Sequence, residues 1–162
     1  NKSPIPFAQE LTHVKHYLNL EKQRFQERLN VVYDIRTENF AIPPLTLQPI
    51  VENAILHSGL NQGDIWIEVE LLANGKIAVL VKNDGTPINP EKIKEVLVQK
   101  NDISSNGIGL QYVARMLENR FGDGFELRAE RTEDGVNVVE IQIPFEAAKI
   151  GAGPDRPERG SQ

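Results

Sequence analysis

Residues 43 to 59 combine a helical pattern with polar side chains that could bind a ligand. Four apolar residues recur at i, i+3, i+4 and i+7, which predicts a helix with one buried face: Leu47, Ile50, Val51 and Ala54. The other side of this helix carries polar groups: Gln48, Glu52, Asn53 and His57. Asn53 and His57 lie one turn apart, so a ligand along the helix could meet an amide and an imidazole together. Gly59 ends the predicted helix.

Two later stretches have residue types that suit a phosphorylated ligand. Asn83-Asp84-Gly85 follows an alternating strand, and Gly107-Ile108-Gly109-Leu110 opens a second amphipathic helix. Glycines at a helix start leave backbone N–H groups uncovered, where the partial positive charge favours phosphate and the missing side chains allow close approach. A Gly-X-Gly before a helix is by itself more often a turn, so the phosphate interpretation depends on the other two stretches.

In this order, a polar helix, a strand ending in Asn-Asp-Gly and a glycine-rich helix start resemble the nucleotide site of the GHKL ATPases. These comprise the ATP-binding domains of gyrase, heat-shock chaperones, MutL and histidine kinases. Within that superfamily the sequence is similar to the LytS/YehU-type sensor histidine kinases, whose proline pair, Gln-Pro-Ile/Leu-Val-Glu-Asn-Ala, His and Gly look like residues 43 to 59. The likeness extends upstream to Glu10-Leu11, Tyr17-Leu18 and Arg24-Phe25, and covers roughly residues 6 to 146.

The resemblance implies ATP and Mg²⁺ as cofactors. Asn53 occupies the position of the asparagine that ligates Mg²⁺ through its side-chain oxygen, and a surface role would leave unexplained why a poor helix former stands mid-helix. The amides from Gly107 to Leu110, Gly109 included, would hold the phosphates.

The expected adenine-binding position departs from the family pattern. Alignment on Gly85 puts Asn83 where the family has an aspartate that accepts a hydrogen bond from the adenine amino group. An amide oxygen can still accept that bond, without the charge that strengthens it. Asp84 is the alternative if the strand is shifted, although a shift of one residue would turn its side chain to the other face.

Other departures concern the phosphates and the attacking group. A lysine that many histidine kinases carry is Leu56 here, which leaves His57 or Lys100 to supply a donor. The position of the water-activating acid of gyrase-like relatives holds Pro49, which has no group to act as a base. This favours a kinase, which must spare the γ-phosphate from water, over an ATPase. Glu52 is the nearby acid and a candidate base, or a group that orients the ligands of the metal.

The sequence is therefore expected to be the catalytic and ATP-binding domain of a two-component sensor histidine kinase, with its phosphoacceptor histidine elsewhere. His13 and His16 are expected to be surface residues, because the family's His-Phe-Leu-Phe-Asn acceptor motif is absent from this sequence. The implied partners are its own dimerisation and phosphoacceptor domain, a response regulator, and a second copy in the full-length protein. Two alternatives stay open: a free-standing GHKL ATPase or serine kinase, and a non-catalytic interaction module of the same fold.

The pattern predicts a two-layer α/β sandwich of the Bergerat type with an N-terminal helix. Alternating runs predict strands in an antiparallel or mixed sheet at residues 29–35, 65–71, 77–81, 125–129 and 139–143. Asn74-Gly75 predicts a tight hairpin, and Gly122 and Gly124 should end the second amphipathic helix. A short helix is expected after Asn89-Pro90-Glu91, and residues 101–106 should be a loop, which in the family closes over ATP.

The first helix has two possible roles. Its apolar residues recur at intervals near 3.5: Phe7, Leu11, Val14, Leu18 and Phe25. It is either an amphipathic helix that covers its own domain or, from the resemblance, the last part of the helical hairpin through which these kinases dimerise. The expected division is residues 1–28 as the end of the dimerisation region, 29–146 as the ATP-binding domain, and 147–162 as a disordered tail.

Composition limits the remaining classes. The formal net charge of −5 argues against general nucleic-acid binding, and the absence of Cys excludes disulfides and thiolate metal sites. We expect a cytoplasmic domain of a membrane-anchored bacterial protein whose anchor lies outside this sequence, because no apolar run is long enough to cross a bilayer. Asn1 in place of Met suggests a fragment or a processed chain.

Overall fold

The computed structural model describes residues 3–24, 28–56, 63–89, 91, 94 and 108–148. Its helices are α1 (Phe7–Arg24), α2 (Leu47–Leu56) and α4 (Ile108–Phe121). Its strands are β1 (Ile5–Pro6), β2 (Leu29–Ile35), β3 (Ala41–Ile42), β4 (Gly63–Leu71), β5 (Lys76–Asn83), β6 (Glu126–Arg131) and β7 (Asn137–Pro144).

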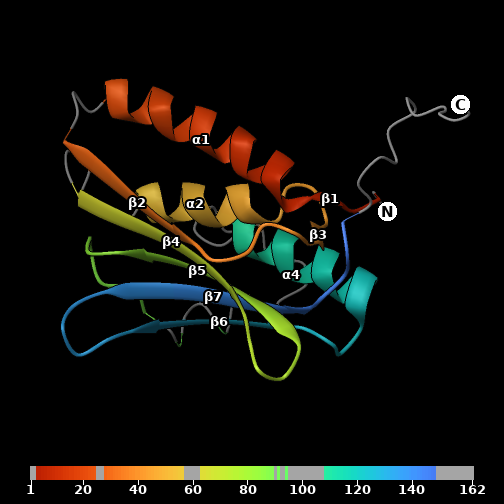
Figure 1. The fold of residues 1–162 in the computed structure, drawn as a ribbon. Helices are drawn as coiled ribbons and strands as arrows, with labels where there is room; N and C mark the ends of the chain where they lie inside the picture. The colour runs from red at the N-terminus through yellow and green to blue at the C-terminus, as the bar shows by residue number, and fades with distance from the viewer. Residues whose placement is uncertain are drawn as a thin grey trace, which may run out of the picture.

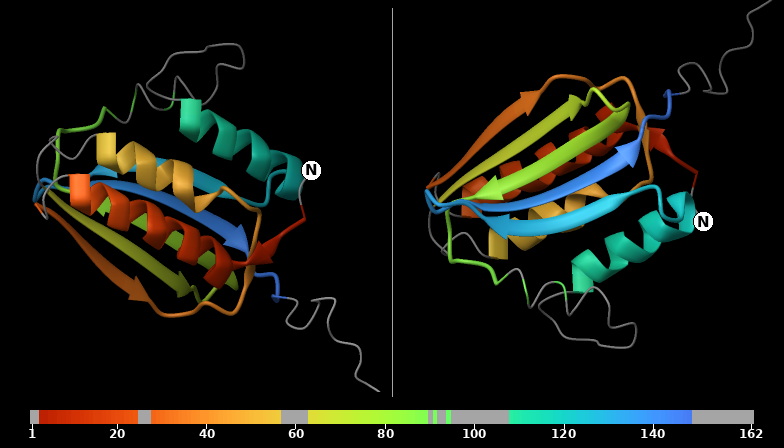
Figure 2. Two further views of the ribbon diagram at one scale, coloured as in Figure 1. Left: turned by 90° about the horizontal axis from the view of Figure 1, so that it is seen from above. Right: turned by 90° about the horizontal axis from the view of Figure 1, so that it is seen from below.

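A five-stranded sheet in the order β2-β4-β5-β7-β6 forms one layer. β2 pairs with β4 in parallel, and the other neighbouring strands are antiparallel, so the sheet is mixed. α1, α2 and α4 cover one face of this sheet (Figures 1 and 2). The predicted two-layer α/β sandwich is therefore confirmed. A small antiparallel pair, β1 with β3, was not predicted from the sequence.

The core lies between the sheet and the helices. Alternation along β4 buries Ile65, Ile67 and Val69, while the residues between them turn to the other face of the sheet. The helices contribute the predicted apolar stripes, and all these side chains form one cluster. Full burial of each such aliphatic side chain contributes about 1.5–3 kcal/mol to folding.

Helix α1 packs into this same core. Its stripe of Phe7, Leu11, Val14 and Leu18 is buried in the cluster, and α1 contacts α2 and β2. The Phe7 ring stacks on that of Phe40, with centroids 4.8 Å apart. α1 thus covers the core of the domain that follows it, as the first of the two expected roles requires. The division at residue 28 and the dimerisation role stay predictions.

Short-range signals in the sequence produce the expected turns. Gly75 adopts φ +87° in the β4–β5 hairpin, and the Lys76 N–H donates to the Asn74 side chain at 2.9 Å. α4 ends at Phe121, and Gly122 follows it with a φ of +60° and an N–H bond to the Glu118 carbonyl at 2.8 Å, which together form a left-handed helix terminus. Both positions require glycine because a positive φ strains residues that have a Cβ.

Several expected features fall largely or wholly outside the described residues: the body of the short helix after Asn89, the loop at 101–106 and the tail from 149 onward. Of the predicted cap, one bond is described, from the Glu91 N–H to the Asn89 side-chain oxygen at 3.1 Å. Of the helices that the structure describes, none combines the length and apolar character needed to cross a membrane.

Candidate functional site

A buried carboxylate from α1 fixes the start of α2. Glu10 is 2% exposed and accepts hydrogen bonds from the backbone N–H groups of Leu45 at 3.1 Å, Leu47 at 3.0 Å and Gln48 at 3.4 Å. Thr46 would cap α2 by residue type, but its hydroxyl donates to the Pro43 carbonyl at 2.6 Å. Because first-turn amides have no partner within their own helix, Glu10 takes over the capping role.

Two sides of α2 face different helices. Gln48 Nε2 donates to Glu52 Oε2 at 3.0 Å, and this side lies toward α1. There Tyr17 is partly buried, and burial together with the carboxylates of Glu21 and Glu52 raises its pKa to about 12. Pro49 lies toward α4, because a Cβ built on Gly109 would be 3.5 Å from the Pro49 Cβ.

This arrangement separates Glu52 from Asn53. Successive helical residues differ by about 100° around the axis, so Asn53 turns away from α1 toward the side of Pro49. Glu52 is held by Gln48 on the other side. The structure gives Glu52 a structural partner and does not support the expected role as a base beside Asn53.

Asn53 has an oxygen available for a cation. Its side chain is half-buried and forms no hydrogen bond within the described part of the chain. Among those residues, no three His, Cys, Asp or Glu side chains form a cluster that could hold a metal ion. Mg²⁺ commonly takes one or two protein oxygens and completes its shell with phosphates and waters, so a single free amide oxygen fits it.

Asn83 lies at the end of β5 with its side chain toward the helices, on the face of Val79 and Val81. It is 4% exposed, and its Oδ1 accepts from the Gly85 N–H at 2.9 Å and from Asn137 Nδ2 at 3.0 Å. Asp84 is exposed, and its Oδ1 accepts from the Asp64 N–H at 2.9 Å. The alternative of a shifted strand is therefore wrong, because Asn83 occupies the inward position.

Asn137, in β7, was missed by the sequence reasoning. It is 1% exposed and pairs with Asn83 across the two strands. Its Oδ1 accepts from the Ile88 N–H at 3.0 Å and Arg131 Nη1 at 2.9 Å, while its Nδ2 also donates to the Thr86 carbonyl at 2.7 Å. The available signal in the sequence was a polar residue directly before the apolar pair Val138-Val139, at the start of the last predicted strand. Asn137 thus holds the backbone after β5 in place.

This network changes the expected mode of base binding. Asn83 was expected to accept a bond from the adenine amino group through its side-chain oxygen. That oxygen already accepts two internal bonds, which fill its two acceptor positions. The expected bond is therefore not available, and Asn83 can contact a base only through its amide nitrogen.

The start of α4 supplies backbone N–H groups. Gly109 is half-buried in the first turn, where amides lack partners within the helix. Leu110 is 2% exposed and anchors this turn in the core. The other two predicted ligand residues, His57 and Gly107, lie outside the described residues.

α2 brings the three stretches together, because it contacts both β5 and α4. In the view from above, α2 lies between α1 and α4 on the sheet (Figure 2). The first turn of α4 lies beside α2, because Gly109 approaches Pro49, while β5, which ends at Asn83, contacts α2 as well. Leu56, at the end of α2, is 71% exposed and offers no polar group there.

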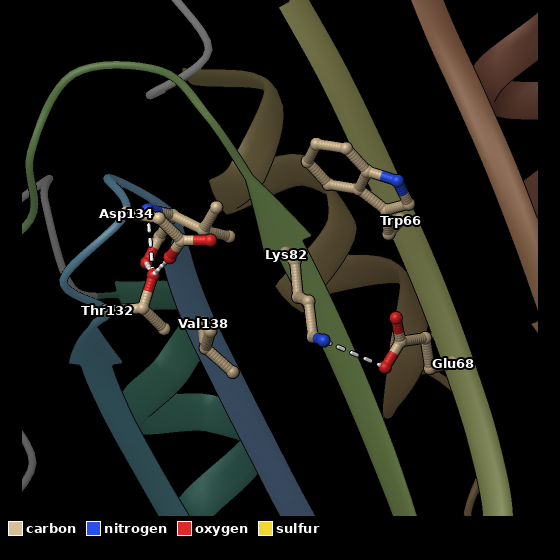
Figure 3. A pocket seen from close by; sticks show the side chains of 7 residues that line it. Trp66, Glu68, Lys82, Thr132, Asp134 and Val138 are labelled. Atoms are coloured by element: carbon tan, nitrogen blue, oxygen red, sulfur yellow. Dashed lines mark hydrogen bonds and ion pairs between the residues drawn. The ribbon is translucent and has the colours of Figure 1, made fainter.

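A separate hollow of about 200 Å³ lies on the opposite face of the sheet. Figure 3 shows it between Trp66, Glu68 and Lys82 and the β6–β7 turn with Thr132 and Asp134. Lys82 Nζ pairs with Glu68 Oε1 at 3.0 Å. Because successive strand residues point to opposite faces, Lys82 lies away from Asn83, and this hollow is not part of the candidate site.

A comparison with protein families identifies the family to which the chain belongs. Residues 45–147 match the family described as histidine kinase-, DNA gyrase B-, and HSP90-like ATPase. The chain belongs to this family. The family match covers all described residues of the candidate site.

Members of this ATPase family with similar sequences include sensor histidine kinases. The chain is 35% identical over 153 residues to sensor histidine kinase YpdA of Escherichia coli (strain K12), covering 91% of this chain and 26% of that protein. It is 31% identical over 158 residues to sensor protein LytS of Enterococcus faecalis (strain ATCC 700802 / V583), covering 93% and 26%. The expected resemblance to LytS-type kinases is confirmed. The chain spans about a quarter of the length of these relatives.

Solved structures show the same fold. The catalytic domain of histidine kinase ThkA matches with a TM-score of 0.72 at 20% identity, covering 90% of this chain and 97% of that chain. Full-length ShkA in complex with AMPPNP matches with a TM-score of 0.67 at 15% identity, covering 91% and 32%. The fold of the ATPase family is thus supported by structure as well as by sequence.

Proposed function

We propose that this chain is the catalytic and ATP-binding part of a sensor histidine kinase of the LytS type. It transfers the γ-phosphate of ATP to a histidine outside this sequence. The observation that supports the proposal is that α2, which carries Asn53, contacts both β5, which ends at Asn83, and α4, which begins at the glycine-rich stretch.

Each of these groups has a role in binding Mg-ATP. Asn53 holds Mg²⁺ through its side-chain oxygen, and the metal, when bound, neutralises part of the phosphate charge. The first-turn amides of α4, at Gly109 and Leu110, and that of Gly107 before it, hold the phosphates. Asn83 and Gly85 bind the base, and His57 supplies a donor to the phosphates.

The side of α2 that faces α4 favours phosphoryl transfer over hydrolysis. Pro49 and Asn53 have no group that removes a proton from water at neutral pH, and Glu52 is held by Gln48 on the side of α1. Without a base beside the nucleotide, water is a poor nucleophile, and a positioned acceptor from a protein is favoured.

The partners follow from the transfer. The acceptor histidine belongs to the dimerisation and phosphoacceptor domain of the same protein, which acts as a homodimer and passes the phosphoryl group to a response regulator. Membrane attachment, where present, comes from segments outside this sequence. His13 and His16 are exposed on α1, as predicted for surface residues, and neither is the acceptor.

Nucleotide binding is tested by calorimetric titration of ATP with and without Mg²⁺. The wild-type chain should bind Mg-ATP and gain melting temperature by mass action. Asn53→Ala should remove the Mg²⁺ dependence and leave the melting temperature without nucleotide within about 2 °C, because the Asn53 side chain forms no hydrogen bond with the described residues. Asn19→Ala is the matched control, since Asn19 is an exposed helical asparagine on α1.

Transfer is tested with labelled ATP and a separate helical segment that contains His-Phe-Leu-Phe-Asn. Acid-labile, base-stable label should appear on the added segment and not on this chain. Label on the chain that disappears in His13→Gln or His16→Gln would contradict the acceptor assignment. Rapid phosphate release without a phosphoprotein would favour the ATPase, and the absence of ATP binding at millimolar concentration would favour a non-catalytic module.

A further inference from the structure

The orientation of the Asn83 amide is fixed by groups that can only donate hydrogen bonds. Its Oδ1 must face the Gly85 N–H at 2.9 Å, because a backbone N–H has no acceptor function. The second partner, Asn137 Nδ2 at 3.0 Å, is itself fixed, since Asn137 Oδ1 faces the Ile88 N–H and the Arg131 guanidinium. A rotation of either amide by 180° would place donors against donors.

The remaining atom of this amide, Asn83 Nδ2, has no internal acceptor among the described residues, although the side chain is 96% buried. Within that part of the chain, Glu21 Oε1 is the one polar side-chain atom that is closed off from solvent and forms no hydrogen bond, although it is ion-paired with Arg24. Asn83 Nδ2 is therefore accessible to solvent, although most of the residue is buried. An unpaired donor at such a position costs free energy unless a ligand or water accepts its hydrogen bond.

An aspartate at this position would leave the internal network intact and reverse the outward polarity. One carboxylate oxygen would accept from Gly85 and Asn137, and the other would point outward as an acceptor. Asparagine presents two N–H donors at the same place. The exposed hydrogen-bonding group thus changes from one that matches a 6-amino purine to one that matches a 6-oxo purine.

We propose that Asn83 makes the base subsite selective for a hydrogen-bond acceptor at purine position 6, so that 6-oxopurine nucleotides such as ITP and GTP bind at least as tightly as ATP. This inference rests on the proposed function, which puts the base beside Asn83. The ring nitrogen N1 of adenine can accept a hydrogen bond from Asn83 Nδ2, so ATP also binds. The amino group of adenine gains no bond from Asn83.

The test measures the dissociation constants of Mg-ATP, Mg-ITP and Mg-GTP by calorimetry for the wild type and Asn83→Asp. ITP is the sharpest probe, because hypoxanthine lacks the 2-amino group of guanine. In the wild type the ratio of the dissociation constants of ITP and ATP should be 1 or less. In Asn83→Asp it should rise about tenfold or more, since a carboxylate accepts from the adenine amino group and repels O6.

Asn89→Asp is the control for added charge. This variant makes the same exchange of asparagine for aspartate at an exposed position six residues after Asn83. An aspartate at position 89 can still accept a hydrogen bond from the Glu91 N–H. This variant should keep the wild-type ratio. If Asn83→Asp does not fold, the wild-type ratio still decides.

Two other results would overturn the inference in different ways. ATP bound more tightly than ITP by the wild type, which gives a ratio above 1, would refute the selectivity and leave the proposed function standing. Binding of no nucleotide by any folded variant would refute the proposed function, and with it the role of Asn83.

Discussion

Glu10 should contribute more to stability than any surface carboxylate of this chain, because it caps a helix from another helix. Its Oε1 accepts from Leu45, and its Oε2 accepts from Leu47 and, at a longer distance, from Gln48. A hydrogen bond to a charged group contributes about 1.5–3 kcal/mol, and a buried donor left unpaired costs about 1–3 kcal/mol. Removal of the carboxylate in Glu10→Ala should therefore lower the free energy of unfolding by about 3–5 kcal/mol.

Glu10→Gln tests the geometry more finely. The amide oxygen can keep the two bonds of Oε2, whereas its NH₂ group must then face the Leu45 N–H. We expect a loss of about half that of Glu10→Ala. Urea unfolding at 25 °C measures both values by linear extrapolation. Gln9→Ala is the matched control, because Gln9 is the exposed neighbour in the same turn of α1.

The outcome bears on the whole domain, whose stability is expected to be about 5–15 kcal/mol. A loss below about 1 kcal/mol in Glu10→Ala, equal to that of Gln9→Ala, would refute the assignment of Glu10 as the cap of α2. A large loss in Glu10→Ala and an equal loss in Glu10→Gln would attribute the effect to charge rather than to the hydrogen bonds.

Two further predictions concern α4 and the contact of α1 with α2. Gly109→Ala should keep the circular dichroism and melting temperature of the wild type, because the added Cβ would lie at an ordinary 3.5 Å from Pro49 Cβ. The variant should nevertheless bind ATP several-fold more weakly, because the methyl group crowds the phosphates. An unchanged affinity by calorimetry would limit the role of Gly109 to helix packing. Since burial and nearby carboxylates raise the pKa of Tyr17 to about 12, its contribution to stability is full below the unfolded pKa of about 10 and is lost as pH rises through about 12. Between pH 9 and 12, the free energy of unfolding measured with urea should decline less in Tyr17→Phe than in the wild type. The difference should be about 1 kcal/mol or less, because Tyr17 is partly exposed. The control Tyr112→Phe, at an exposed tyrosine, should follow the wild type.

Local patterns predicted most of the fold. The alternation at Ile65, Ile67 and Val69 and the stripe of α2 identified the buried faces, because burial follows the periods of strand and helix directly. Asn74-Gly75 gave the hairpin for a similar local reason. Strand order and the parallel pairing of β2 with β4 were not predicted, because they depend on contacts between segments that are distant in the sequence.

The sequence indicated the stretches of the candidate site but not the hydrogen bonds that connect them to the rest of the fold. The three stretches around Asn53, Asn83 and Gly109 were identified from residue types and from a family resemblance. The bonds from Glu10 to α2 and from Asn137 to Asn83 join residues 35 to 54 positions apart, and no local spacing indicates them. Glu10 left one signal, since a charged residue on an apolar helical stripe needs a buried partner. Helix geometry places Glu52 and Asn53 on different sides of α2. Only the structure shows that the side of Glu52 faces α1.

The pairing of β5 with β7 affects how the chain can change in length. Residues 76–83 lie beside residues 137–144, so the chain from 84 to 136 leaves the middle of the sheet and returns to the same end of it, where Asn83 meets Asn137. Closing this excursion carries an entropic penalty that grows only with the logarithm of its length, by about 0.6 kcal/mol for each doubling. Insertions in the connections between these two strands, outside α4 and β6, would leave the pairing of β5 with β7 unchanged. The same wide separation should slow folding, because the central strand pair forms only after a long loop closes.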